Sequence, residues 1–90
     1  MIPERDRIVQ LAAKYGAHNL RVFGSWARQE QTPESDLDLL VAMEGGRSYL
    51  DLIAFWLALQ DLLKRKVDVV TDKGLSPFLR DRILKEAVPL

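Results

Sequence analysis

The chain has 90 residues, enough for one domain with a single hydrophobic core, because a chain of this length buries only about 60% of the surface that its unfolded form exposes. Its 13 basic and 13 acidic residues cancel, so no overall charge draws it to a nucleic-acid strand or an anionic membrane. The lack of cysteine excludes a disulfide framework and a thiolate metal site. A charged start and the lack of a long apolar run argue against a signal peptide and a membrane span. We therefore expect residues 1–90 to form one cytoplasmic domain.

The first predicted element is an amphipathic helix. Apolar residues recur at helical spacing over residues 3–15, where Pro3 suits a first helical turn and Gly16 ends the helix. Weakly alternating residues 20–23 predict the first strand. His18 precedes this strand, and we expect it on the surface.

A turn then leads to the second predicted strand. Gly24 and Ser25 close the first strand, and residues 26–30 can form a short helix. Residues 37–42 predict the second strand, whose alternation puts Leu37, Leu39 and Val41 on one face and Asp38 on the other.

The second half of the chain predicts two further helices and a third strand. Ser48 and Asp51 resemble a capping box that opens a long helix, which runs to about residue 66. Residues 66–71 predict the third strand, and a proline in the first turn begins a last helix over residues 77–86. The predicted order is α-β-α-β-α-β-α, and we expect an α/β fold in which helices flank a small mixed sheet. The strand order cannot be read from this pattern.

Three aspartates lie on or beside the predicted strands. Asp36 and Asp38 are two residues apart, so both carboxylates project from one face of an extended chain, and Asp68 interrupts a valine-rich strand. Taken singly, Asp36 suits a turn and Asp68 a solvent-facing strand position. Strands are depleted in Asp, and carboxylates beside a core need a cation or hydrogen bonds to balance their charge. Together, these oxygen ligands favour Mg²⁺ or Mn²⁺.

The turn at Gly24 and Ser25 is a candidate anion site. It joins a strand to a short helix, where backbone N–H groups attract a phosphate and glycine permits close approach. Arg28 is a candidate phosphate ligand, although it could instead pair with Glu30 or face solvent. Trp26 suits either a cover for a bound nucleotide or a place in the core.

These two groups of residues form one pattern, G-S-x10-D-x-D, followed by an acid on a later strand. The pattern resembles the nucleotidyltransferase superfamily that includes DNA polymerase beta, and the stretches around Ser25 and Asp36 resemble its minimal nucleotidyltransferase, or MNT, proteins. The similarity covers essentially the whole chain and implies the polymerase beta-like fold. One departure is Gln29, where these proteins often have Gly after the Ala-Arg pair, and it affects the local turn rather than the metal ligands.

The resemblance also implies roles for the candidate residues. Ser25 and the Gly24 backbone would hold the triphosphate of ATP, Asp36 and Asp38 would bind two divalent metal ions, and Asp68 would complete the site beside the acceptor hydroxyl. Two such ions stabilise the attacking oxygen and the leaving pyrophosphate, while a nearby carboxylate takes up or orients the hydroxyl proton.

Small MNT proteins also look like the antitoxins of toxin–antitoxin pairs whose toxin is an all-helical HEPN ribonuclease. There the transferase adds AMP from ATP to a tyrosine of the toxin, so the resemblance implies a protein adenylyltransferase with a HEPN partner. One alternative is a non-catalytic antitoxin that masks its partner. Another is an aminoglycoside-type transferase, which usually has an extra helical domain. The zero net charge disfavours a groove for nucleic acid.

The long helix is apolar nearly all round, which leaves its buried face undecided. One predicted stripe contains Tyr49, Leu52, Ile53, Trp56 and Leu59, and outside it fall Phe55, Leu57 and Leu62. Either the terminal helices cover these residues, or an exposed apolar patch marks a protein partner. The basic residues 64–66 predict a cationic end of this helix.

Overall fold

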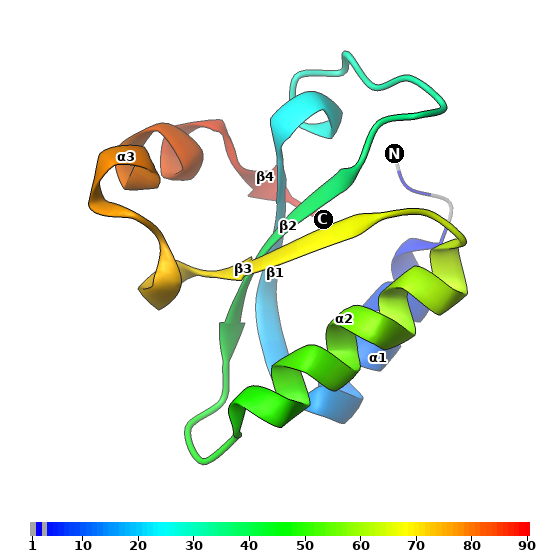
Figure 1. The fold of residues 1–90 in the computed structure, drawn as a ribbon, viewed down its shortest axis with the longest axis vertical. Coiled ribbons are helices and arrows are strands. Elements are labelled where there is room, and N and C mark those ends of the chain that lie inside the picture. Colours follow the sequence, from blue (N-terminus) through cyan, green and yellow to red (C-terminus); the bar gives the residue numbers. More distant parts are fainter. Residues whose placement is uncertain (1, 3) are drawn as a thin grey trace.

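The computed structural model describes residue 2 and residues 4–90, so the helical role predicted for Pro3 lies outside the described residues. The elements are α1 (Arg5–Tyr15), β1 (Ala17–Phe23), the 3-10 turn η1 (Gly24–Trp26), β2 (Leu37–Met43), α2 (Tyr49–Leu63), β3 (Val67–Thr71), the 3-10 turn η2 (Asp72–Gly74), α3 (Pro77–Glu86) and β4 (Val88–Pro89) (Figure 1). The predicted α/β class is confirmed.

The elements differ from the sequence-based prediction at several points. The first strand begins at Ala17, so His18 lies within β1 rather than before it, although it is exposed as expected. The short helix expected over residues 26–30 is only the three-residue turn η1. A fourth strand, β4, follows the last helix and was not predicted, because two residues are too few to show an alternating pattern.

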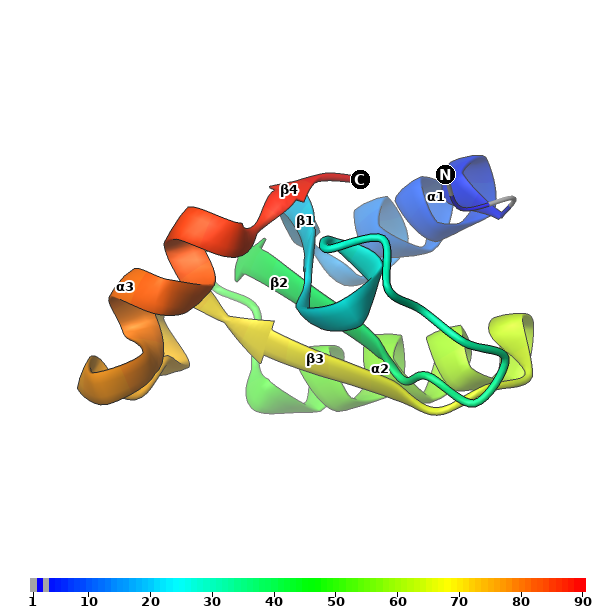
Figure 2. The ribbon, with the colours of Figure 1, turned by 90° about the horizontal axis from the view of Figure 1, so that it is seen from above.

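The four strands form one mixed sheet in the order β3-β2-β1-β4. β1 is antiparallel to both of its neighbours, whereas β2 and β3 run parallel and are joined by α2 as a crossover. Helices α1 and α2 pack against each other on one face of the sheet. Helix α3 stands apart from them at the other end of the molecule in both views (Figures 1 and 2).

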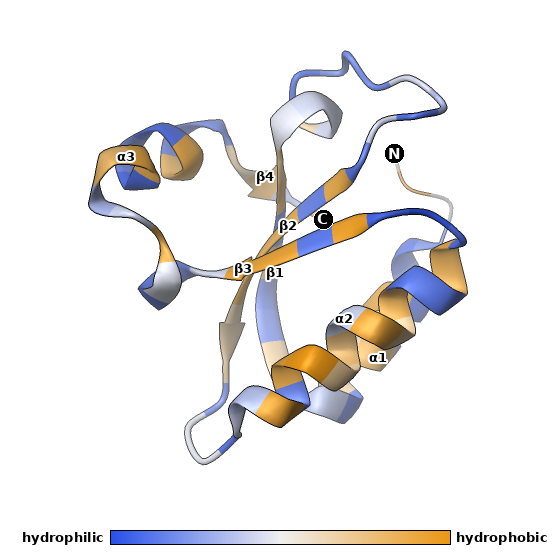
Figure 3. Ribbon diagram, in the orientation of Figure 1, coloured by the Kyte–Doolittle hydropathy of each residue, from blue (hydrophilic) through white to orange (hydrophobic). Residues whose placement is uncertain are grey.

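Side chains of β2 and β3 alternate between the two faces of the sheet. Leu37, Leu39 and Val41 belong to the buried core with Val67, on the face that the helices cover. The residues between them face the opposite side, where Asp38 interrupts the apolar sequence. Figure 3 shows hydrophilic bands between hydrophobic ones on both strands. The predicted placement of Leu37, Leu39 and Val41 on one face and Asp38 on the other is thus confirmed, although the fully buried Leu40 shares the face of Asp38.

Local signals determine where α1 and α2 begin and end. Gly16 adopts a left-handed conformation with φ 82° and ends α1 as predicted. At the start of α2, the Ser48 N–H donates to the Asp51 carboxylate at 3.0 Å, which confirms the capping box. Helix α2 ends at Leu63, earlier than expected, because Lys64 is left-handed with φ 54°.

The basic residues 64–66 lie at the C-terminus of α2, where Lys64 is the cap, but none of them belongs to the last helical turn. Lys64 pairs with Asp61 at 3.1 Å, while Lys66 lies 3.6 Å from the Asp36 carboxylate. The Arg65 guanidinium lies over the ring of Trp26, 5.1 Å from its centroid. Trp26 itself packs against the core, which was one of the two roles considered for it.

The buried face of α2 differs from the predicted stripe. Phe55 and Leu59 are fully buried, and the residues of α2 that pack beside them against the core are Leu52, Leu62 and Leu63. The exposed apolar residues of α2 are Tyr49, Leu50, Ile53, Trp56 and Leu57. Because apolar side chains occur all round this helix, only its contacts with α1 and the sheet select a buried face.

Helix α3 is held by its ends rather than by its own packing. It contains no fully buried residue, and its N-terminus is capped by the Ser76 hydroxyl, which accepts from the Phe78 N–H at 3.3 Å. After α3 the chain returns along β1, where β4 pairs Val88 with Val22 and the Leu90 N–H donates to the Leu20 carbonyl at 3.1 Å. The described residues contain no helix long and apolar enough to cross a membrane.

Candidate active site

The parallel register of β2 and β3 places two of the three predicted aspartates side by side. Asp38 of β2 pairs with Asp68 of β3, on the sheet face that α1 and α2 leave uncovered. Asp38 is half-buried and Asp68 is exposed. Neighbouring strands lie about 4.8 Å apart, so the two carboxylates are close enough to interact strongly.

The environment of Asp38 disfavours its negative charge. Burial is the main cause that raises its pKa from 3.8 to about 6, followed by repulsion from Asp68 and a hydrogen bond with it. The charges of Asp36 and Glu86 add to the effect. The site therefore holds an excess of negative charge that a bound cation would relieve.

Asp36 is close to this pair but its carboxylate is directed elsewhere. It precedes β2, and its Oδ2 lies 3.6 Å from the Lys66 Nζ. Within residue 2 and residues 4–90, no three acidic or histidine side chains converge to hold a metal ion. The three-aspartate cluster is thus only partly assembled.

The donors nevertheless suit a hard divalent cation. Asp38 and Asp68 offer carboxylate oxygens, the ligands that Mg²⁺ and Mn²⁺ prefer, without competing nitrogen or sulfur ligands. The Asp36–Lys66 pair is largely exposed, and such pairs contribute at most about 1 kcal/mol, so Asp36 can turn toward a cation at little cost.

The Gly24 turn lies directly against the Asp38 carboxylate. Gly24 has φ 73°, and a Cβ added to it would collide with the Asp38 Oδ2. Glycine is therefore required twice, once for the backbone conformation and once for the close approach. Ser25 follows as a half-buried residue of η1. Gly24 and Asp38 are 14 residues apart in the sequence. In the fold, the turn and the paired aspartates nevertheless form one site.

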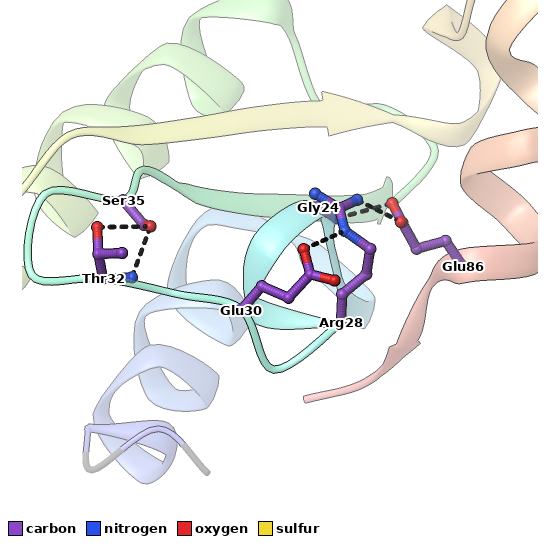
Figure 4. A network of polar contacts seen from close by, with 6 residues as sticks. All are labelled: Gly24, Arg28, Glu30, Thr32, Ser35 and Glu86. Atoms are coloured by element: carbon purple, nitrogen blue, oxygen red, sulfur yellow. Dashed lines mark hydrogen bonds and ion pairs between the residues drawn. The ribbon is translucent and has the colours of Figure 1, made fainter.

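Glu86 joins this site from the end of α3, and the sequence motif offered no signal for it. The Gly24 N–H donates to the Glu86 Oε2 at 2.9 Å, and the Arg28 guanidinium donates to the Glu86 Oε1 at 2.5 Å (Figure 4). Arg28 also donates to Glu30 at 3.4 Å, one of the pairings considered for it. The hydrogen bond from Arg28, and next that from Gly24, lowers the pKa of Glu86, whereas Glu86 raises the pKa of Arg28.

The backbone conformation at Gln29 shows why MNT proteins often have glycine at this position. It adopts a left-handed conformation with φ 58°, which glycine occupies without strain. The turn keeps its shape through backbone bonds, in which Arg28 N–H donates to Gly24 O at 3.2 Å and Glu30 N–H to Ser25 O at 2.9 Å. Glutamine is therefore tolerated here, at a cost in strain.

A mixed sheet with helices on one face, and paired aspartates beside a Gly-Ser turn on the other, defines the nucleotidyltransferase class of fold. The profile of the family described as "Polymerase beta, Nucleotidyltransferase" matches residues 6–90, and the chain belongs to this family. This match confirms the resemblance seen in the motif. The chain is therefore a nucleotidyltransferase.

Similar proteins agree with this assignment. A protein of Methanocaldococcus jannaschii named "Putative protein adenylyltransferase MJ0435" is 43% identical over 84 residues, which cover 93% of this chain and 90% of that protein. The solved "Structure of putative minimal nucleotidyltransferase" has a TM-score of 0.86 at 50% identity and covers 97% of this chain and 89% of its own. The "Crystal structure of the toxin-antitoxin with AMP-PNP" shares the fold with a TM-score of 0.81 at 20% identity, over 98% of this chain and 72% of its own.

Proposed function

We propose that this chain, as a single domain over residues 1–90, is a metal-dependent protein adenylyltransferase. In this proposal it transfers AMP from ATP to a tyrosine hydroxyl of a HEPN-type ribonuclease toxin and so acts as the antitoxin. The observation that carries the proposal is the Asp38–Asp68 pair with the Gly24 turn against it. The name of the Methanocaldococcus relative supports protein adenylylation, and the toxin–antitoxin structure with AMP-PNP supports ATP and a toxin as the two substrates.

The proposed reaction forms a bond between the acceptor oxygen and the α-phosphorus of ATP. The bond from that phosphorus to the β-phosphate bridging oxygen breaks, and pyrophosphate leaves. Asp68 is exposed beside Asp38 and takes the hydroxyl proton as the oxygen attacks. Asp36, Asp38 and Asp68 would hold Mg²⁺ or Mn²⁺, which would supply electrostatic stabilisation of the attacking and leaving oxygens. No covalent enzyme intermediate is required, since phosphoryl transfer depends mainly on positioning and charge.

The triphosphate in this proposal is held by the Gly24 turn, Ser25 and Arg28. The Gly24 N–H donates to Glu86, so the turn offers the phosphates the Ser25 hydroxyl and the backbone after Gly24, next to the metal carboxylates. The guanidinium of Arg28 has five N–H donors, and its bonds to Glu30 and Glu86 leave others for a phosphate. Arg28 is 43% exposed and can be reached from solvent.

The exposed apolar side of α2 is the surface we assign to the partner protein. Tyr49 is 77% exposed, Leu50 74% and Leu57 52%, so several large apolar side chains lie uncovered on one helix. Such a patch commonly marks a protein interface. A chain that bound its toxin here without transferring AMP would be a masking antitoxin, which is the second candidate function.

The test of this proposal is intact-mass spectrometry of a purified HEPN toxin after incubation with the chain, ATP and Mg²⁺. Wild type should add one or more AMP groups, and a metal chelator should prevent the addition. Asp68→Ala should add none and still co-purify with the toxin, because the α2 surface is unchanged. Asp81→Ala, which removes an exposed acid on α3, is the matched control and should transfer normally.

Two results would contradict adenylylation of the toxin. If wild type silences the ribonuclease without adding mass, the masking function replaces the enzymatic one. If wild type instead modifies a sugar hydroxyl of an aminoglycoside and leaves the toxin unmodified, the acceptor in this proposal is wrong although the metal site is retained.

A further inference from the structure

Glu86 reaches the candidate site because of strand register. Antiparallel pairing of β1 with β4 sets Arg21 opposite Pro89 and Val22 opposite Val88. Continuing that register by two residues brings Gly24 opposite Glu86. The backbone bond from Leu90 N–H to Leu20 O extends the same pairing in the other direction. Glu86 thus precedes the strand that pairs with β1 and is held beside Gly24 by its own hydrogen bond, even though α3 contains no fully buried residue.

The Glu86 carboxylate joins the two groups that the proposed function assigns to the triphosphate. One oxygen accepts from the Gly24 N–H at 2.9 Å and the other from the Arg28 guanidinium (Figure 4). The Glu86 side chain is only 20% exposed, whereas Glu30, the second partner of Arg28, is 65% exposed. The contact with Glu86 is also shorter, 2.5 Å against 3.4 Å for Glu30, so Glu86 is the stronger of the two restraints on Arg28.

This placement is electrostatically unfavourable for the metal carboxylates. The charge of Glu86 adds to the repulsion that Asp38 already receives from Asp68 and Asp36. A residue needed only to attach α3 could be neutral and would avoid this repulsion. A carboxylate, in contrast, accepts from Gly24 with one oxygen and from Arg28 with the other, and this charge-assisted bond limits the orientation of the guanidinium. The negative charge of Glu86 is therefore explained by its restraint of the Arg28 guanidinium.

We propose that Glu86 is a positioning residue for triphosphate binding, whose carboxylate is anchored by the Gly24 N–H and holds Arg28 ready for the phosphates of the nucleotide. The inference rests on the proposed function, because it acts through the phosphate role of Arg28. Glu86 itself contacts no phosphate. Its contribution is to reduce the freedom that Arg28 would lose on binding.

A double-mutant cycle tests this inference by calorimetric titration with a non-hydrolysable ATP analogue in the presence of Mg²⁺. Arg28→Ala and Glu86→Ala should each weaken binding roughly tenfold, the size expected for the loss of a hydrogen bond to a charged group. The double variant should bind no more weakly than Arg28→Ala alone, because Glu86 acts only through Arg28. Glu30→Ala is the matched control and should change affinity less than twofold.

Other outcomes separate this inference from the proposed function. If Glu86→Ala binds the analogue normally while Arg28→Ala binds it more weakly, the inference is overturned and the proposed function is not. The same holds if the losses of affinity in the two single variants add up in the double variant. Tighter binding in Glu86→Ala also overturns it, since the carboxylate would then compete with the phosphates. Unchanged affinity in Arg28→Ala overturns the inference and removes Arg28 from the site, while adenylylation stays open to the Asp68→Ala mass assay. If Glu86→Ala does not fold, Glu86→Gln keeps an acceptor for the Gly24 N–H and should still weaken binding severalfold.

Discussion

The two faces of β2 and β3 differ sharply although they are built from alternate residues of the same strands. On the covered face, Leu37, Leu39 and Val67 are fully buried beneath α1 and α2. On the open face, Asp38 and Asp68 repel each other at the same level of the sheet. Side chains one residue apart therefore serve opposite purposes, since one face stabilises the fold and the other carries charge that costs stability.

This comparison also shows why the site tolerates unfavourable charge. The covered face contributes most of the buried apolar surface, and it is separated from the acids by the thickness of the sheet. The left-handed backbone of Gly24 and the charge repulsion between Asp38 and Glu86 both lie on the open face. Such local cost is common at functional sites, where the surrounding structure holds residues in place.

The largest expected effects come from two single substitutions, one on each face of the sheet. Asp38→Asn should lower AMP transfer by at least 100-fold, because a metal ligand is lost, and should leave stability unchanged or higher. Leu39→Ala should lower the free energy of unfolding by about 2–5 kcal/mol, because it leaves a cavity in the core. Urea denaturation and a transfer assay measure both quantities. Near-normal transfer by Asp38→Asn would remove the distinction between the faces.

A second pair of variants tests the contact between the turn and the acids. Gly24→Ala should lower transfer at least tenfold, because the new Cβ displaces the Asp38 carboxylate. Gly46→Ala shares the left-handed backbone, with φ 87°, but meets nothing within 4 Å. Both should lose roughly 1–2 kcal/mol of stability through backbone strain, while only Gly24→Ala should lose activity. Equal activities would show that close approach to Asp38 is unimportant.

The pH dependence of stability sharpens the comparison further. Asp38 has a pKa of about 6 in the folded chain against 3.8 ordinarily, so its ionised form opposes folding and its protonation favours it. The stability advantage of Asp38→Asn over wild type should thus be full above pH 6 and disappear as the pH falls toward 4. After allowance for partial exposure, we expect a difference of about 1–2 kcal/mol near pH 7.

Thermal unfolding of both proteins in a chelator across this pH range measures the difference. Other titrating groups are common to both proteins and cancel to first order. Added Mg²⁺ should reduce the difference at pH 7, because a cation stabilises the ionised pair in wild type. A difference that grows as the pH falls would contradict the cause assigned to the raised pKa.

The smallest expected effect concerns the turn that leads from β1 to the open face. Gln29→Gly should raise the free energy of unfolding by about 0.5–1 kcal/mol, because glycine relieves the left-handed strain at φ 58°. Gln29→Ala, which keeps a Cβ, should give no such gain. Chemical denaturation resolves changes of this size. A gain in both variants would assign the effect to the glutamine side chain and not to the backbone.

Features that depend on neighbouring residues were largely predicted from the sequence. The capping box at Ser48, the end of α1 at Gly16 and the apolar alternation of β2 all arise from contacts or directions within a few residues. The Gly-Ser and Asp-x-Asp motifs also identified the family, because their spacing along the chain is itself the signal.

Tertiary structure decided which of these residues meet. Pairing of Asp38 with Asp68 depends on the parallel register of β2 and β3, and the contact of Glu86 with Gly24 depends on the two-residue strand β4. The buried face of α2 likewise depended on its contacts, since its apolar residues point in all directions. Register and face are chosen by the burial of whole surfaces between segments far apart in sequence, so no local pattern records them. The sequence by itself therefore determined the elements, the motif and the chemical class, while the arrangement of charge around Asp38 arose only when those surfaces packed together.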